Sequence, residues 1–222
     1  MAEGGEADFR AVDALARLDR ITRRLRRECP WDREQDERSI VPHTVEEAYE
    51  LADAAERGDD AKLLDELGDV LFQVVFLALL LEERGAGDLA AVAREITAKL
   101  IRRHPHVFGD ESGAESVAAI DPGPESAGDV LRNWDRIKRD VEGRGGDEDP
   151  FADIPRGLPA LLYARKVLRR VDPEGGGAAP RREDRDAAEA EVGQLLLKAV
   201  ETSRELGVDP ELALRAAADR LR

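Results

Sequence analysis

Five acidic residues in two short segments have the types and spacing that a metal site requires. Glu46, Glu47 and Glu50 form the first segment, and Glu66 and Asp69 form the second. Glu47 and Glu50 stand three residues apart, as do Glu66 and Asp69. Residues with this spacing lie on one face of an α-helix, so each segment is expected to present a pair of carboxylates.

The two pairs are expected to face each other across a helical hairpin. Glu50 lies eight residues before Gly58, and Glu66 lies seven residues after Asp59, so at about 1.5 Å per residue both stand ~10–12 Å from the turn. Four facing carboxylates repel one another unless a cation neutralises them. Oxygen ligands without histidine or cysteine favour Mg²⁺ or Mn²⁺ over zinc. The predicted ligands are Glu47, Glu50, Glu66 and Asp69; the alternative is a solvent-facing acidic surface.

Turn residues and apolar periodicity predict the helices that would hold these acids. Thr44 with Glu47 matches a capping box that begins one helix, and Gly58 ends it. The segment from Cys29 to Pro42 holds two prolines and is expected to be irregular. The expected helices run from about Phe9 to before Pro30, from Thr44 to about Glu56, from Asp60 to Gly85, from Asp88 to Arg103, from Asp129 to about Val141, from about Leu158 to Val171, and beyond Pro180.

The composition favours a helical fold. Aromatic residues make up 4% of the chain, and β-branched runs bounded by hairpin turns are scarce, so we expect an all-α helical bundle. The segment from Val70 to Leu81 contains only Gln73 as a polar residue. One hairpin cannot cover so much apolar surface, and we therefore expect a homodimer to complete the bundle. A solvated basic face is expected at Arg23, Arg24, Arg26 and Arg27.

The charge and the termini exclude several classes of protein. A net charge of −15 argues against stable binding to nucleic acid or to an anionic membrane. The longest apolar run, Val70 to Leu81, is too short to span a bilayer, and Met1 to Asp8 lack the apolar core of a signal peptide. The single cysteine, Cys29, excludes an internal disulfide. We expect a cytoplasmic protein.

These acids and four further motifs resemble the MazG nucleotide pyrophosphohydrolases. The acidic motif of that family is two glutamates, two residues and a glutamate, then a glutamate and an aspartate three apart, and it is matched by Glu46, Glu47, Glu50, Glu66 and Asp69. The further matches are Cys29-Pro30-Trp31-Asp32 with Gln35, the run from Lys99 to Phe108, Asn133-Trp134 with Lys138, and Asp153 to Leu161. After Gln35 the family usually shows Thr-His, whereas this sequence has Asp36-Glu37.

The resemblance implies hydrolysis of nucleoside triphosphates to a monophosphate and pyrophosphate. It implies Mg²⁺, with Mn²⁺ as a substitute, on the four predicted ligands, because this chemistry needs charge neutralisation and an activated water. Glu46 would hold a second metal or orient the water. Triphosphate contacts are implied for Lys62, Lys99, Arg102, Arg103 and Lys138, and stacking on the base for Trp134. The alternatives are solvated cations near helix ends and simple packing of Trp134.

Three regions are expected: a catalytic helical lobe at 1–112, a loop with nucleotide-contacting and connecting helices at 113–171, and a linker with a degenerate repeat at 172–222. Glu191-Val192-Gly193-Gln194 repeats the form of Glu66-Leu67-Gly68-Asp69, but Gln194 replaces the aspartate. No glutamate motif precedes it, so this lobe is expected to be inactive. The alternative is an unrelated amphipathic hairpin.

Two other function classes fit part of the pattern. A di-iron bundle needs Glu-x-x-His on two helices, and this motif does not occur in the sequence. A non-catalytic bundle that binds nucleotide or a partner would carry the same acids. An assay for monophosphate and pyrophosphate distinguishes it from an enzyme.

Overall fold

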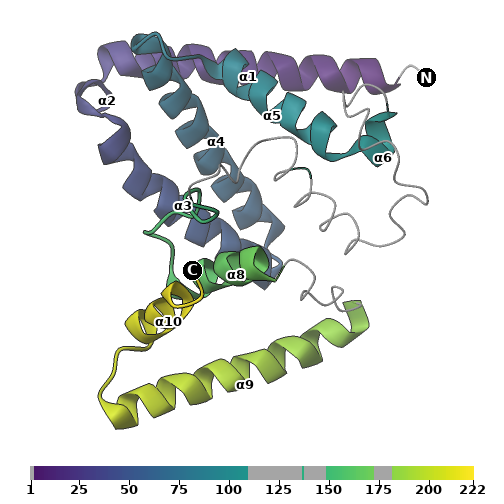
Figure 1. Ribbon diagram of the computed structural model, residues 1–222. Coiled ribbons are helices and arrows are strands. Elements are labelled where there is room, and N and C mark those ends of the chain that lie inside the picture. The colour runs from purple at the N-terminus through teal and green to yellow at the C-terminus, as the bar shows by residue number, and fades with distance from the viewer. Residues whose placement is uncertain (1–2, 110–136, 138–148, 173–181) are drawn as a thin grey trace. The chain divides into compact units, whose positions relative to one another are not determined.

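The computed structural model describes residues 3–109, 137, 149–172 and 182–222 (Figure 1). Every regular element within these ranges is a helix, which confirms the all-α fold. The expected helix from Asp129 to Val141, with Trp134 and Lys138, lies outside the described residues except for Ile137. Of the helices described, none has the length and apolarity to cross a membrane.

The contacts within the chain divide it into two compact units, Met1–Ala98 and Lys99–Arg222. The first unit contains α1 (Glu3–Glu28), α2 (Pro30–Glu34), α3 (Glu37–Arg57), α4 (Asp60–Glu83) and most of α5 (Leu89–Arg103). The second contains α6 (Pro105–Phe108), α8 (Ala160–Val171), α9 (Arg182–Leu206) and α10 (Pro210–Asp219). The three functional regions expected from the sequence remain a prediction.

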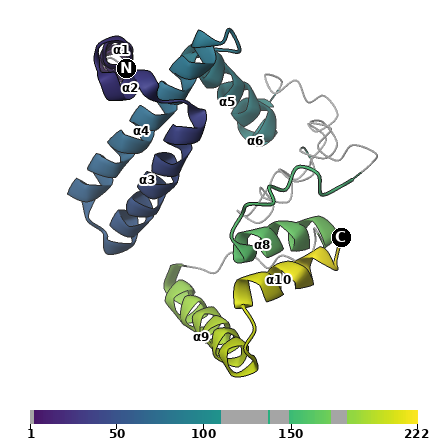
Figure 2. The same cartoon turned by 90° about the vertical axis from the view of Figure 1, so that its left-hand side faces the viewer.

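The α3–α4 hairpin is the central feature of the first unit (Figure 2). Gly58 ends α3 with φ 66°, a left-handed conformation that favours glycine. Asp59 begins α4, and its side chain accepts a hydrogen bond from the Lys62 amide. The two helices enclose a core formed by Ile40, Phe76 and Leu80, with Phe72 and Leu77 packed against it.

The chain before the hairpin is more regular than expected, and two expectations for it are wrong. Residues 30–34 form α2, and α3 begins at Glu37 rather than at Thr44. The cap is Asp36, whose Oδ1 accepts a hydrogen bond from the Ser39 amide at 2.8 Å, while Ser39 Oγ accepts one from the Asp36 amide at 2.9 Å. Thr44 and Pro42 lie inside the helix.

Two arginines of α1 form hydrogen bonds to glutamates of α4. Arg23 forms hydrogen bonds of 2.9 and 2.6 Å to the carboxylate of Glu82, and Arg26 forms two of 2.8 Å to that of Glu83. The expected solvated face is therefore wrong for Arg23 and Arg26, since each makes a two-point contact with a carboxylate of another helix. Arg24 is exposed, and its ion pair stays within α1.

The second unit has its own core between α8 and α10. Tyr163 and Val167 of α8 are buried together with Phe151, Ile154 and Ala218. Between α9 and α10, Gly207 adopts φ 66° and the Asp209 side chain caps α10. The α4–α5 turn has the same local order, with Gly85 at φ 68° and the Asp88 side chain bonded to the Ala91 amide.

Candidate metal centre

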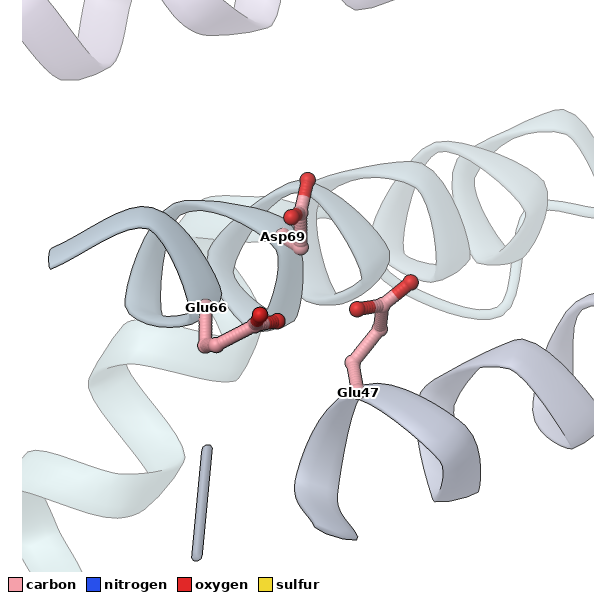
Figure 3. Close-up of side chains that lie close together, drawn as sticks. All are labelled: Glu47, Glu66 and Asp69. Carbon is pink, nitrogen blue, oxygen red and sulfur yellow. The ribbon is translucent and has the colours of Figure 1, made fainter. Parts of the chain in front are cut away.

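The α3–α4 hairpin brings acids from both predicted segments together. One carboxylate oxygen each from Glu47, Glu66 and Asp69 lie within 4.8 Å of one another. Figure 3 shows Glu66 and Asp69 on one helix, with Glu47 extending toward them from the facing helix. We call these three residues the acid trio. Glu50 is the predicted ligand outside the trio, although it lies close enough to Glu66 for a hydrogen bond between the two side chains.

The acid trio runs from the interior to the surface. Glu66 is fully buried, Glu47 is half-buried and Asp69 is exposed. The buried Oε2 atom of Glu66 receives no hydrogen bond within the described part of the chain. Burying a carboxylate oxygen that accepts no hydrogen bond is costly, and a cation bound to that oxygen would remove the cost. The unsatisfied oxygen therefore fits a metal ligand better than a structural side chain.

The clustering of charge raises the pKa of two acids at the site. The pKa of Glu47 is raised above its ordinary value of 4.5, first by burial and then by the negative charges of Asp69, Glu50 and Glu66. The pKa of Glu50 is raised chiefly by the charge of Glu66. The negative charges on these acids are therefore disfavoured by one another, and a cation bound among them would relieve this repulsion.

The donors of the acid trio suit a hard divalent cation. All three residues offer carboxylate oxygens, and none offers nitrogen or sulfur. Such a set matches Mg²⁺ or Mn²⁺ and is unlike the nitrogen and sulfur sets typical of zinc. The trio thus fits the expected type of metal, while the identity of the ion is a proposal.

The other predicted site residues lie in different surroundings. Lys62 contacts Glu66 directly, and its pKa is raised by hydrogen bonding to Glu66 and then to Asp65. Glu46 is exposed, with Oε2 3.8 Å from Nδ1 of His43. The three cations Lys99, Arg102 and Arg103 are half-buried near the C-terminal end of α5. The functional roles of these residues remain predictions.

Sequence reasoning assigns no role to two polar residues of α4. The carboxylate of Asp65 lies 3.2 Å from the Lys62 ammonium group. Their three-residue spacing in the sequence could have predicted this contact. Gln73 is 7% exposed, and its buried Oε1 has no hydrogen-bond partner among the described residues. The sequence feature that could have pointed to Gln73 is that it is the single polar residue in the apolar run Val70–Leu81.

Comparison with known proteins decides the family. Residues 35–108 match the model of the MazG nucleotide pyrophosphohydrolase domain. The chain is 36% identical over 233 residues to a nucleoside triphosphate pyrophosphohydrolase of Escherichia coli, and the match covers 94% of this chain and 84% of that protein. This chain belongs to the MazG family.

Other MazG relatives support the same assignment. A nucleoside triphosphate pyrophosphohydrolase/pyrophosphatase MazG of Thermotoga maritima is 38% identical over 205 residues, which covers 85% of this chain and 74% of the relative. A nucleoside triphosphate pyrophosphohydrolase of Mycobacterium tuberculosis is 34% identical over 168 residues, which covers 75% of this chain and 46% of the relative. The expected family and enzyme class are thereby confirmed. The matched MazG segment contains α3, α4 and α5, and hence the acid trio.

Proposed function

We propose that this MazG chain hydrolyses nucleoside triphosphates to a nucleoside monophosphate and pyrophosphate, using Mg²⁺ held by Glu47, Glu50, Glu66 and Asp69. The observation that carries the proposal is the acid trio, with oxygens within 4.8 Å around the fully buried Glu66. The names of the relatives from E. coli and T. maritima support the reaction class.

The acids have different tasks in this proposal. A bound divalent cation would supply charge neutralisation for phosphate oxygens and a water of lowered pKa. Glu66 is the anchoring ligand because burial restricts its side chain, and Glu47 and Asp69 complete the set from two helices. Glu50 adds a carboxylate beside Glu66. Glu46, exposed next to Glu47 in the sequence, orients the attacking water and accepts its proton.

The substrate carries several negative charges and requires cations and space. A shallow hollow of about 700 Å³ borders Lys62, Asp65, Gly68 and Asp69 on the first half of α4. Asp69 is the member of the acid trio that lines this hollow, and the triphosphate is proposed to approach the site from this side. In the proposed complex, the contacts to phosphate and base come from Lys62, Lys99, Arg102, Arg103, Lys138 and Trp134.

Turnover of each nucleoside triphosphate with Mg²⁺, with the products resolved, tests the proposal. Glu47→Gln and Asp69→Asn are expected to lower kcat/KM by at least ~100-fold, because each removes a metal ligand. Helical content should stay near that of the wild type, since each change relieves repulsion. Asp53→Asn, an exposed position on the same helix as Glu47, is the control and should keep full activity.

Two results would contradict this assignment. Near-normal turnover of either ligand variant at saturating Mg²⁺ would show that the acid trio is not the catalytic centre. Binding of nucleotide by the wild type without release of pyrophosphate would favour the non-catalytic alternative.

A further inference from the structure

Lys62 is bound to the acid of the trio that has the least freedom to move. Its Nζ contacts Oε1 of Glu66 and lies 3.2 Å from Oδ2 of Asp65. The side chain of Glu66 is 1% exposed, whereas that of Lys62 is 51% exposed. The ammonium group thus reaches from the surface to a buried carboxylate.

Lys62 and a divalent cation require the same carboxylate. Within the described ranges, Lys62 is the only lysine or arginine that forms an ion pair with a member of the acid trio. A divalent cation on the trio would lie close to the ammonium group, and the two positive charges would repel each other. Both groups cannot be bound to Glu66 at full strength.

The two partners of this ion pair differ in their ability to move apart. Glu66 is enclosed between helices, so its carboxylate cannot turn away without disturbing the packing. Lys62 has a flexible four-carbon stem and a half-exposed side chain that borders the hollow beside Asp69. Lys62 is therefore the partner that can move when a cation takes up both oxygens of the Glu66 carboxylate, while the glutamate stays in place.

On the basis of the proposed function, we propose that Lys62 is a positioning residue that neutralises Glu66 in the metal-free protein and competes with the divalent cation for this carboxylate. The competition lowers the affinity of the free enzyme for metal. Once displaced, the ammonium group lies on the side of the hollow, where it faces the phosphates of the substrate. Lys62 thus links metal binding to substrate binding.

Calorimetric titration of Mn²⁺ into the metal-free full chain, without nucleotide, tests this inference. Lys62→Met removes the charge and keeps a long stem, and its Kd for Mn²⁺ is expected to fall by about tenfold because the competitor is gone. Lys62→Arg keeps a cation and should stay near the wild type. The matched control is Lys198→Met, which removes an exposed lysine paired three residues away on α9 and should leave the Kd unchanged.

The melting temperature gives a second readout. Metal-free Lys62→Met should melt below the wild type, because Glu66 has lost its counter-charge, and Mn²⁺ should raise its melting temperature more than that of the wild type. An unchanged or larger Kd for this variant, with intact wild-type binding, overturns the role of Lys62 alone. If the wild type binds no Mn²⁺, or if Glu47→Gln binds it equally tightly, the metal site fails and the proposed function fails with it.

Discussion

Glu66 is both a buried residue of the α3–α4 hairpin and a candidate metal ligand. Full burial holds its carboxylate between the two helices, which suits a ligand that must keep its direction. The same burial leaves Oε2 without a donor in the described structure, and Lys62 pairs with Oε1 alone, so part of the cost of burying this carboxylate remains. Glu47 and Asp69 are more accessible and carry less of this cost. If the acid trio binds a cation as proposed, folding and metal binding are coupled most strongly at Glu66.

The raised pKa of Glu47 predicts a pH effect on stability. Between the ordinary pKa of 4.5 and the raised value, the folded metal-free protein holds a proton that the unfolded chain has lost. The free energy of unfolding contributed by this group therefore falls as the pH rises through that window. Urea titrations with a chelator, from about pH 4 to about pH 8, should show a smaller fall for Glu47→Gln than for the wild type.

Acids outside the acidic cluster do not confound this comparison. The pKa values of Glu82 and Glu83 are lowered, chiefly by hydrogen bonds from Arg23 and Arg26, so their stabilisation is lost as the pH falls. These contributions occur in both proteins and cancel in the difference. Superimposable pH profiles for the wild type and Glu47→Gln would refute the coupling between Glu47 and the acid trio.

Among the elements, the turn between α3 and α4 could be predicted because its signals are local. Gly58 supplies the left-handed residue that ends α3, and Asp59 caps α4. Counting residues from this turn predicts that Glu47, Glu66 and Asp69 meet, as they do. Residue counting cannot predict which acid is buried, and it cannot predict that Glu50 lies outside the trio. Both depend on the direction of the side chains and on the angle at which the helices cross.

The start of α3 could not be predicted by the same means. Pro42 is a strong local signal for a late start at Thr44, since proline removes a backbone donor inside a helix. The structure instead begins α3 after Asp36 and keeps Pro42 within it. Ile40, which this longer helix places 1% exposed against Phe76, offsets the cost. That contact joins residues far apart in the sequence, so a pattern of neighbouring residues cannot predict it.

The contact between α1 and α4 was equally inaccessible to local patterns, and it yields a test. Arg26 has a 17% exposed side chain, holds Glu83 through two hydrogen bonds and donates to the Gln35 carbonyl. Arg26→Ala is expected to lower the free energy of unfolding by about 1–3 kcal/mol in urea titrations, because it breaks charge-assisted bonds. Arg24→Ala, at an exposed pair within α1, should cause no measurable loss. Equal losses would show that the helix contact is unimportant.

At the scale of the molecule, one apolar face of α4 is exposed among the residues that the structure describes. Leu64 is 74% exposed and Leu67 is 49% exposed, and Leu71 and Val74 continue the row at helical spacing. We expect a second copy of the chain to cover this face. Light scattering should give about twice the 24.4 kDa chain mass.

A substitution on this face provides the control for that prediction. Leu67→Glu should shift the protein toward the monomer, because it places a charge in the buried interface. Leu206→Glu, at a 72% exposed position at the end of α9, should leave the mass unchanged. A wild-type monomer at micromolar concentration would count against the dimer.

The C-terminal lobe is expected to take no part in the chemistry. Glu191 stands where the repeat places the counterpart of Glu66, but it is exposed. Glu191→Gln should therefore leave kcat/KM unchanged in the full chain. Loss of activity would show that this lobe contributes to catalysis. Truncation after Val171 is a less specific test, because it removes α10 and exposes Tyr163 and its core.

The acid trio is contained in one hairpin, and this has a consequence for how the protein is made. The hairpin extends from Glu37 to Glu83, so its contacts are short in sequence and close rapidly. Synthesis proceeds from the N-terminus, and α8 and α10 are translated long after the hairpin has left the ribosome. The ligands can thus assemble on a nascent chain without waiting for the second unit. If the acid trio binds a cation as proposed, the cation can be taken up while the chain is still being synthesised.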